Sequence, residues 1–283
     1  MTETTLFSAI EGGRGDDFLS GGAGNDTYFW SPGDGLDTVN DGENNDTIIF
    51  GEGVYANEIK FRCINDHDLQ IMVGGSDKQG IIIRDFFYGT ERIYKTLQFA
   101  DGSEMRLSDK GFELWQTDET EKITAGGFDD IIHAGGGDDY VNAGHGNDTI
   151  IGGRGNDTLH GGEGDDVYVW NRGDGLDEIW EDAGSDTIRF GEGITFDDLT
   201  FACENGYLLI TVDGDDTQGV KIRDFFGSQK YKYMIEKLEF ADGSSFNLAE
   251  SGLTLTQKNT AEQIDGTDFD DIIHGNGGSD TIH

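Results

Sequence analysis

A nine-residue pattern of small, acidic and apolar positions repeats along the chain. Its clearest copies are adjacent and read GGRGNDTLH and GGEGDDVYV, over residues 152–169. The first six positions end on an Asp and are rich in glycine, the residue that adopts positive φ angles at no steric cost. The last three positions place an apolar residue between two others, as in a short strand with one inward side chain. The pattern therefore predicts a six-residue turn followed by a three-residue strand.

The sixth-position Asp marks three arrays of this unit. Within an array the markers lie nine residues apart, except for one eleven-residue step in each of the first two arrays. They are Asp17, Asp26, Asp37 and Asp46 in the first array, Asp130, Asp139, Asp148, Asp157, Asp166, Asp177 and Asp186 in the second, and Asp271 and Asp280 in the third. Turns stacked at this period would also stack their carboxylates, and that arrangement requires a cation.

A larger repeat, with an offset of about 140 residues, contains the smaller one. GDGLDTV recurs as GDGLDEI, TIIFGEG as TIRFGEG, IIIRDFF as VKIRDFF, and LQFADGS as LEFADGS. Repetition at two periods is typical of a solenoid. We therefore expect an all-β chain with roll segments at 1–54 and 123–194, the start of a third at 264–283, and β-rich inserts at 55–122 and 195–263. Within the first insert, TLQFADGSEMRL predicts a hairpin with Asp-Gly at its turn.

The charge of the chain is strongly negative, with 57 acidic and 19 basic residues and a formal net charge of −38. This balance excludes nucleic acid as a natural partner, because phosphate contacts require Lys and Arg. A solvated acidic face or disorder is the alternative interpretation, but the acids are in register with glycines and inward aliphatic residues. No stretch resembles a transmembrane segment or a signal peptide. The sequence stops in mid-array at His283, so we expect it to be part of a longer protein.

The repeating turn offers oxygen ligands alone, from backbone carbonyls and a carboxylate. Calcium takes about six to eight oxygens in flexible geometry, whereas magnesium requires a stricter octahedron. Zinc or copper would need His or Cys in register, and the six His residues do not supply that. We therefore predict calcium as the bound ion and interpret the His residues as incidental.

At these nonapeptides the chain resembles the RTX, or haemolysin-type calcium-binding, repeat family. The resemblance implies a parallel β-roll in which two units form one coil and each calcium ion lies between turn n and turn n+2. One turn would supply the carbonyls of positions two and four with its Asp, and the other the carbonyls of positions one and three with its Asp. The two best-matching sites would join Gly135, Gly137 and Asp139 to Gly152, Arg154 and Asp157, and Gly144, Gly146 and Asp148 to Gly161, Glu163 and Asp166.

The same rule implies five flanking sites, whose turns depart from the pattern, as where Phe128 replaces a glycine. In the second array they would join Gly126, Phe128 and Asp130 to Ala143, His145 and Asp148; Gly153, Gly155 and Asp157 to Arg172, Asp174 and Asp177; and Gly162, Gly164 and Asp166 to Glu181, Ala183 and Asp186. In the first array they would join Gly13, Gly15 and Asp17 to Pro32, Asp34 and Asp37, and Gly22, Gly24 and Asp26 to Asp41, Glu43 and Asp46. The third array offers Asp271 and Asp280 on consecutive turns, which cannot complete a site, so we expect a half-formed tip.

The inserts resemble the haemolysin-type calcium-binding-related segment that accompanies such arrays. Their function is not evident from the sequence. The aromatic pairs Phe86-Phe87 and Phe225-Phe226 are interpreted as core or roll-capping residues rather than as a ligand platform.

The resemblance implies a calcium-binding module that folds on binding calcium outside the cell. Its partners would be calcium ions and, through a large parent protein of toxin-like or other exoprotein type, the type I secretion machinery. The alternative hypotheses are a calcium-dependent adhesin or glycan-binding module, or an accessory module of a secreted enzyme such as an epimerase, protease or lipase. The chain has no HExxH or GxSxG motif, so we predict that it is not itself an enzyme.

Overall fold

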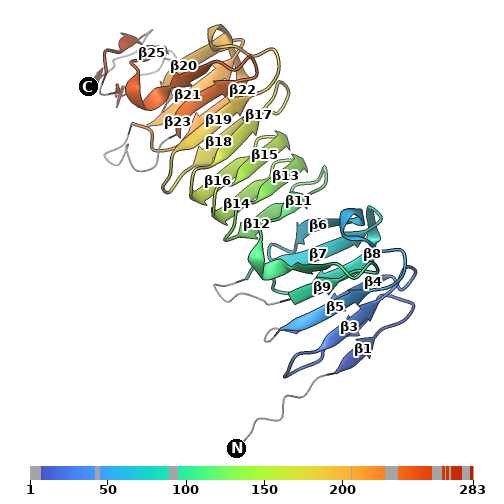
Figure 1. Cartoon of the computed structure of the whole chain (residues 1–283). Helices are drawn as coiled ribbons and strands as arrows, with labels where there is room; N and C mark the ends of the chain where they lie inside the picture. The colour runs from blue at the N-terminus through green and yellow to red at the C-terminus, as the bar shows by residue number, and fades with distance from the viewer. Residues whose placement is uncertain are drawn as a thin grey trace, which may run out of the picture. The chain divides into compact units, whose positions relative to one another are not determined.

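The computed structural model describes residues 8–41, 45–88, 95–204, 206–226, 235–256, 263–264, 266–267, 269–275 and 281–282. It contains two compact units, Met1–Trp115 and Gln116–His283, coloured from blue to red along the chain in Figure 1. The described residues form β-strands and four short 3₁₀ turns, and none of their helices is long and apolar enough to cross a membrane. The expected all-β class is confirmed.

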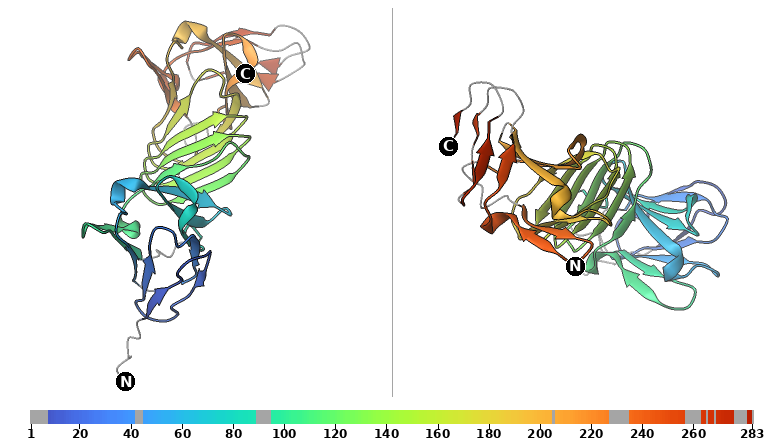
Figure 2. Two further views of the ribbon diagram at one scale, coloured as in Figure 1. Left: turned by 90° about the vertical axis from the view of Figure 1, so that its right-hand side faces the viewer. Right: turned by 90° about the horizontal axis from the view of Figure 1, so that it is seen from above.

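The roll of the second unit consists of two parallel sheets, and successive strands alternate between them. One face holds β13 (Ile131–Gly136), β15 (Thr149–Arg154), β17 (Val167–Trp170) and β19 (Asp186–Phe190). The other holds β12 (Lys122–Gly126), β14 (Tyr140–His145), β16 (Thr158–Glu163) and β18 (Leu176–Trp180). Figures 1 and 2 show these strands stacked as successive rungs. This is the parallel β-roll that the nonapeptide implied.

The core of this roll comes from the eighth position of each unit. Ile132 pairs with Ile150 on one face and Val141 with Leu159 on the other, each 18 residues further along the chain. All of these side chains are buried, as are Ile123, Ala125, Ala134, Ala143, Tyr168, Ile179 and Ile188. Because the strands are only a few residues long, one or two inward apolar side chains per strand suffice to fill the space between the faces.

The second insert continues both faces of the roll. Its strands are β20 (Leu199–Glu204), β21 (Tyr207–Val212), β22 (Asp215–Ile222), β23 (Ile235–Phe240), β24 (Ser245–Asn247) and β25 (Thr254–Thr256), with 3₁₀ turns η3 (Phe196–Asp198) and η4 (Leu248–Glu250). Strand β22 adds in parallel to β18, and β23 adds in parallel to β19. The chain then reverses direction through antiparallel pairs.

The third array begins on that insert. Strand β25 pairs in parallel with β20 and with β27 (Ile272–His274). The opposite pair is β26 (Gln263–Ile264) with β28 (Thr281–Ile282). The third array therefore starts a new two-sheet coil on the insert's own strand edge.

The first unit repeats this plan. One sheet has the order β1 (Ala9–Glu11), β3 (Thr27–Trp30), β5 (Asp46–Phe50), β9 (Lys95–Gln98) and β10 (Glu104–Arg106), and the other has the order β2 (Phe18–Leu19), β4 (Leu36–Val39), β8 (Ser76–Ile83), β7 (Asp68–Val73), β6 (Ile59–Ile64) and β11 (Glu113–Trp115). The 3₁₀ turns are η1 (Ala56–Glu58) and η2 (Leu107–Asp109). Strands β9 and β10 form the predicted antiparallel hairpin, with Leu97 opposite Met105.

Turn glycines permit the coils to approach one another closely, and Gly155 provides a test. Its φ is +145°, and a Cβ at this position would lie 1.8 Å from the carbonyl oxygen of Gly137. We expect Gly155→Ala to destabilise the calcium-loaded second unit by about 3 kcal/mol. The added Cβ would clash with backbone, which cannot move aside as a flexible side chain can.

The matched control is Gly127→Ala, where an added Cβ meets nothing within 4 Å. Its effect should stay within about 0.5 kcal/mol. Urea unfolding followed by circular dichroism measures both, and equal midpoints for the two variants would contradict the close-approach argument.

Candidate metal centres

The marker Asp residues are joined in pairs along the edges of each roll. In every pair, the backbone N–H of the Asp in turn n donates to Oδ1 of the Asp in turn n+2. The N···O distances are 2.7 Å for Asp130–Asp148, 2.8 Å for Asp139–Asp157, 2.7 Å for Asp148–Asp166, 3.0 Å for Asp157–Asp177, 2.9 Å for Asp166–Asp186, 3.0 Å for Asp17–Asp37 and 2.8 Å for Asp26–Asp46. The structure therefore brings together all seven Asp pairs that the sequence singled out.

The second oxygen of most of these carboxylates is buried without a partner. Oδ2 accepts no hydrogen bond in Asp17, Asp26, Asp37, Asp139, Asp148, Asp157 and Asp166. Apart from Asp17, these residues are at most 3% exposed. A buried ionised oxygen without a partner is strongly unfavourable. The donor set thus fits a hard cation, which would compensate the charge and satisfy the oxygen together.

Burial also changes the acidity of this row. It raises the pKa of Asp139 and Asp148 to about 7 and that of Asp157 to about 6, with backbone hydrogen bonds opposing the shift and neighbouring carboxylates adding to it. Asp177 is affected more strongly, and burial raises its pKa to about 8. Without a cation, the row therefore holds protons near neutral pH.

The turn backbone places the expected carbonyls against the neighbouring coil. The carbonyl of Glu163 accepts the N–H of Gly146 at 2.9 Å, and Asp174 and Ala183 accept those of Gly155 and Gly164 at 2.8 and 2.9 Å. In the first unit, Asp34 accepts the N–H of Gly15 at 2.7 Å. The glycines expected at positions two and four have positive φ throughout, namely Gly13, Gly15, Gly22, Gly24, Gly126, Gly135, Gly137, Gly144, Gly146, Gly153, Gly155, Gly162 and Gly164.

The first position of the turn faces its own Asp. A Cβ added at Gly152 would lie 2.4 Å from Oδ2 of Asp157, and one at Gly161 would lie 2.2 Å from Oδ2 of Asp166. Glycine at this position therefore keeps space open beside the unpartnered oxygen.

The remaining residues expected at the sites differ in where the structure places them. Arg154 pairs with Gly136 in the sheet register, and the side chains of His145 and Glu163 meet at the surface, 3.1 Å apart. Asp271 accepts the N–H of Leu253, where the other turns have an Asp or Glu. Glu43 and Asp280 lie outside the described residues. The expected half-formed tip falls mostly on such residues, so it stays a prediction.

The sequence pattern did not identify one turn at the start of the second array. The backbone N–H of Glu121 donates to Oδ1 of Asp139 at 2.8 Å, as a marker Asp would. The carbonyl of Thr117 lies where a turn glycine's would, and it accepts the N–H of Gly136 at 3.0 Å. Counting back nine residues from Asp130 reaches Glu121, but the segment QTDETE contains no glycine. The spacing alone was the available signal.

Two further carboxylates join the marker rows. Candidate ligand oxygens of Asp166, Glu181 and Asp186 lie within 4.8 Å of one another, as do those of the corresponding trio Asp26, Asp41 and Asp46. The resemblance assigned a carbonyl role to Glu181 and Asp41, whereas the structure turns their carboxylates inward, where both residues are buried. Their side chains lie beside markers from other turns, a convergence that spacing along the chain does not reveal.

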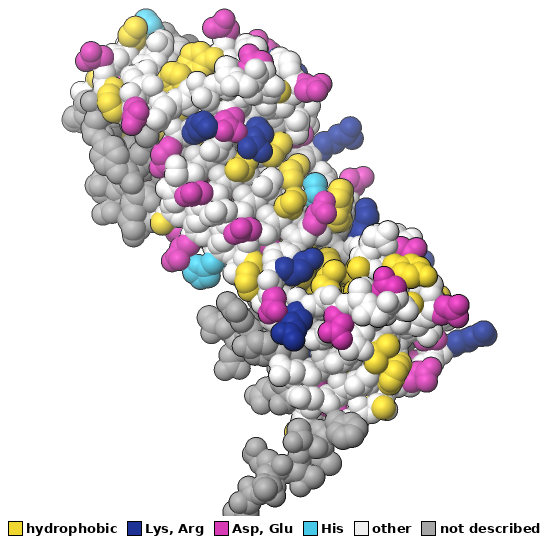
Figure 3. Space-filling view, viewed as in Figure 1, with side chains coloured by type: hydrophobic (Ala, Val, Ile, Leu, Met, Phe, Trp, Pro, Cys, Tyr) yellow, Lys and Arg dark blue, Asp and Glu magenta, His cyan; other side chains and the backbone are white. Residues whose placement is uncertain are grey.

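Acidic side chains elsewhere have a different setting. On the face viewed in Figure 3 they are dispersed over the surface rather than gathered in one patch. Solvent screens such charges, so they make a small contribution to structure. The paired carboxylates in the turns are therefore set apart by burial, and not by acidity alone.

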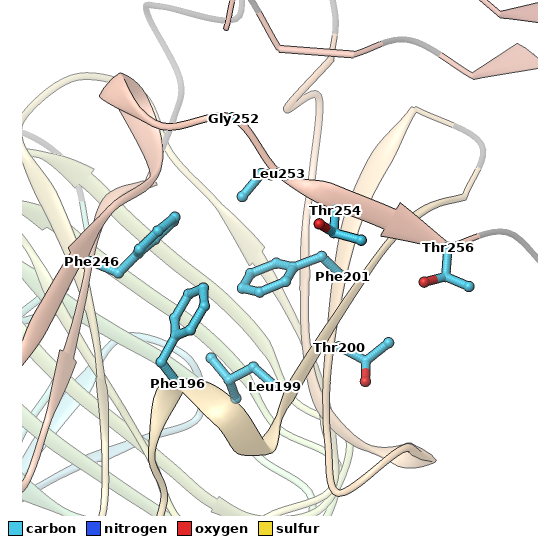
Figure 4. A pocket seen from close by; sticks show the side chains of 9 residues that line it. All are labelled: Phe196, Leu199, Thr200, Phe201, Phe246, Gly252, Leu253, Thr254 and Thr256. Carbon is cyan, nitrogen blue, oxygen red and sulfur yellow. The ribbon is translucent and has the colours of Figure 1, made fainter. Parts of the chain in front are cut away.

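The second insert carries a hydrophobic hollow of about 450 Å³. Figure 4 shows the rings of Phe196, Phe201 and Phe246 gathered at one side of it, beneath the strand that carries Thr254 and Thr256. The ring centroids of Phe196 and Phe246 are 4.5 Å apart, so these rings pack chiefly on one another.

The aromatic pairs singled out in the sequence lie elsewhere. Phe225 and Phe226 are buried, as expected of core residues. Phe86 and Phe87 are half-buried and pack edge-to-face against Phe112.

Comparisons with known proteins agree with this geometry. The family model described as RTX calcium-binding nonapeptide repeat matches four segments, residues 9–29, 115–150, 146–176 and 259–283. The model described as haemolysin-type calcium binding protein related domain matches residues 208–250, within the second insert. No curated protein sequence matches the chain. Among solved structures, the extracellular lipase LipA from Serratia marcescens is similar over 77% of this chain and 36% of its own, with 16% identity and a TM-score of 0.28.

The parallel roll and its rows of turn carboxylates define a repeat protein of the calcium-binding β-roll class. The chain carries four segments of the RTX calcium-binding nonapeptide repeat, and a haemolysin-type calcium binding protein related domain lies in its second insert. The chain spans about a third of the length of the lipase that it resembles.

Proposed function

We propose that this chain is a calcium-dependent folding module of a protein that is exported unfolded and folds outside the cell. The observation that carries the proposal is the row of buried carboxylates, each with one oxygen accepting an N–H of the preceding coil and the other without a partner. Such a row is compatible with a stable fold only when a cation compensates it.

The residues that would hold calcium are those of the paired turns. The N–H of Asp139 donates to Asp157 and that of Asp148 to Asp166, and Oδ2 of each of these four residues is buried without a partner. The ligand atoms of these turns are oxygens only, which suits calcium and not zinc or copper. Calcium supplies the positive charge in this role, and the turns supply the geometry.

Coupling between sites makes the folding response steep. Asp157 pairs with both Asp139 and Asp177, and Asp148 pairs with both Asp130 and Asp166. Since each inner Asp serves two neighbouring pairs, organising one site orders the next. An ion bound only by the folded state stabilises it by about 2.7 kcal/mol at a hundredfold excess over Kd.

The module would thus suit export by type I secretion, with the chain unfolded at low calcium inside the cell and folded at millimolar calcium outside. A toxin-like protein, an adhesin and a secreted enzyme could each use it in this way. In each case the proposed role of this chain is structural and non-catalytic.

The direct test is to titrate the metal-free chain with calcium. We expect a gain of β-sheet circular dichroism that is steep in calcium concentration and is reversed by EDTA, because the ionised carboxylates repel one another without the ion. Magnesium at the same concentration is the control and should give a much smaller gain. Identical spectra in EDTA and in millimolar calcium would refute the proposal.

A further inference from the structure

The two copies of the roll end on equivalent clusters of three carboxylates. In the second unit they belong to Asp166, Glu181 and Asp186, and in the first to Asp26, Asp41 and Asp46. Each cluster also contains a buried tyrosine. The hydroxyl of Tyr168 donates to the Glu181 carboxylate, and that of Tyr28 donates to the Asp41 carboxylate. The two clusters thus share their acids and their hydrogen-bonding plan.

A lysine is present in the first cluster. Lys95, on strand β9, is 1% exposed. Its ammonium donates to the backbone carbonyl oxygen of Asp41 at 2.8 Å and to Oδ2 of Asp46. These two oxygens belong to the ligand set that the repeat pattern assigns to an ion at this edge of the roll. The ammonium therefore sits on the atoms that an ion would use.

The second cluster has an acid at the aligned place in the sequence. Counting back from the matching segments LQFADGS and LEFADGS, Lys95 aligns with Glu236. In the sheet register, Lys95 is opposite Asp46, whereas Ile235 is opposite Asp186 and Glu236 lies at a register shift. Oε2 of Glu236 accepts the N–H of Asp186 at 2.7 Å, so its carboxylate extends the row. Within the described part of the chain, no Lys or Arg forms an ion pair with Asp166, Glu181 or Asp186.

The second cluster also has oxygens without partners. Oδ2 of Asp166 and Oε2 of Glu181 are buried and accept no hydrogen bond. Asp166 is fully buried and Glu181 is 6% exposed. These two unpartnered oxygens indicate a cation site; the first cluster has one such oxygen, Oδ2 of Asp26, and its lysine shows where positive charge is accommodated.

We propose that the Lys95 ammonium replaces a calcium ion at this edge of the first roll, while the equivalent cluster of the second roll binds calcium with the Glu181 carboxylate as an additional ligand. The inference rests on the proposed calcium binding of the turns. An ammonium already bonded to two of the oxygens excludes the ion by occupying its ligands and by charge repulsion. At this edge of the first roll, Asp46 is then paired with the ammonium at any calcium concentration, while Oδ2 of Asp26 keeps no partner.

A charge exchange between the copies tests the proposal in the full chain. Native mass spectrometry at saturating calcium counts the ions bound per chain. Lys95→Glu and Lys95→Gln should each bind one more calcium ion than the wild type, because the oxygens are released. Glu236→Lys should bind one fewer, because it brings an ammonium to the second cluster. Lys237→Gln, on the same strand but paired with Glu239 rather than with the cluster, is the control and should keep the wild-type count.

The outcomes separate this inference from the general function. If the wild-type chain binds no calcium, the proposed function fails and the inference fails with it. If the wild type binds calcium but the Lys95 variants and Glu236→Lys keep its count, the inference alone is overturned. Circular dichroism in calcium verifies folding of each variant. If Lys95→Glu does not fold, Lys95→Gln and the exchange in the second unit give the same readout.

Discussion

Replacing Asp157 with Asn is expected to raise the calcium concentration at the folding midpoint at least tenfold, and to remove two calcium ions per chain. Asp157 accepts the N–H of Asp139 and donates its own N–H to Asp177, so it belongs to two adjacent pairs. Asn keeps the size and the accepting oxygen but removes the charge. A tenfold change corresponds to about 1.4 kcal/mol. Calcium titration followed by circular dichroism measures the midpoint, and native mass spectrometry measures the ion count.

The control is Asp197→Asn, which removes an exposed carboxylate remote from the marker rows. It should leave both the midpoint and the ion count unchanged. In metal-free buffer, Asp157→Asn should be no less stable than the wild type, since a neutral amide lowers the cost of burial. An unchanged calcium midpoint for Asp157→Asn would contradict the assignment of this residue to two sites.

Acidification should stabilise the metal-free chain. Burial raises the pKa of Asp139 and Asp148 to about 7 and that of Asp177 to about 8, from an ordinary value of 3.8. A raised pKa in the folded state means that the fold binds protons more tightly than the unfolded chain does. The resulting stability is fully present below pH 3.8 and is lost as pH rises through about 6 to 8. We therefore expect more β-sheet circular dichroism at pH 5 than at pH 8 in metal-free buffer.

Calcium should reverse this dependence, because the ionised carboxylates are the form that binds it. At pH 8 the calcium-loaded chain should be far more stable than the metal-free chain, and at pH 5 the difference should shrink. The double variant Asp148→Asn with Asp157→Asn lacks two of the carboxylates with raised pKa. It should therefore lose part of the pH dependence. Metal-free stability that rises from pH 5 to pH 8 would show that the buried row is not protonated as described.

The array was accessible from the sequence because its interactions recur at a constant separation. Asp139 and Asp157 are 18 residues apart and Asp157 and Asp177 are 20 apart, and both pairs meet as the family resemblance implied. Each coil repeats the backbone path of the one before it, so a local pattern and its period suffice to place partners on adjacent coils.

The repeat pattern did not predict how the inserts attach to the rolls. Their strands were expected from apolar alternation, but their attachment was not. Strand β8 pairs with β4 and strand β22 with β18, so in each unit the insert's hydrogen bonding is continuous with the roll. Which strand joins which edge depends on packing between segments about 40 residues apart, and no local pattern records it.

By itself, the sequence determined the turn, the inward apolar position and the marker Asp residues, because these repeat along each array, and the family resemblance added the two-sheet coil and the pairing of the Asp residues. Only the tertiary structure decided that Glu121 completes an unmarked turn, that the Glu181 carboxylate turns inward, and that Lys95 reaches Asp46 from 49 residues away. The physical reason is that these contacts arise where the repeat ends. There the charge of the last carboxylates must be compensated by whatever neighbour the folded chain supplies.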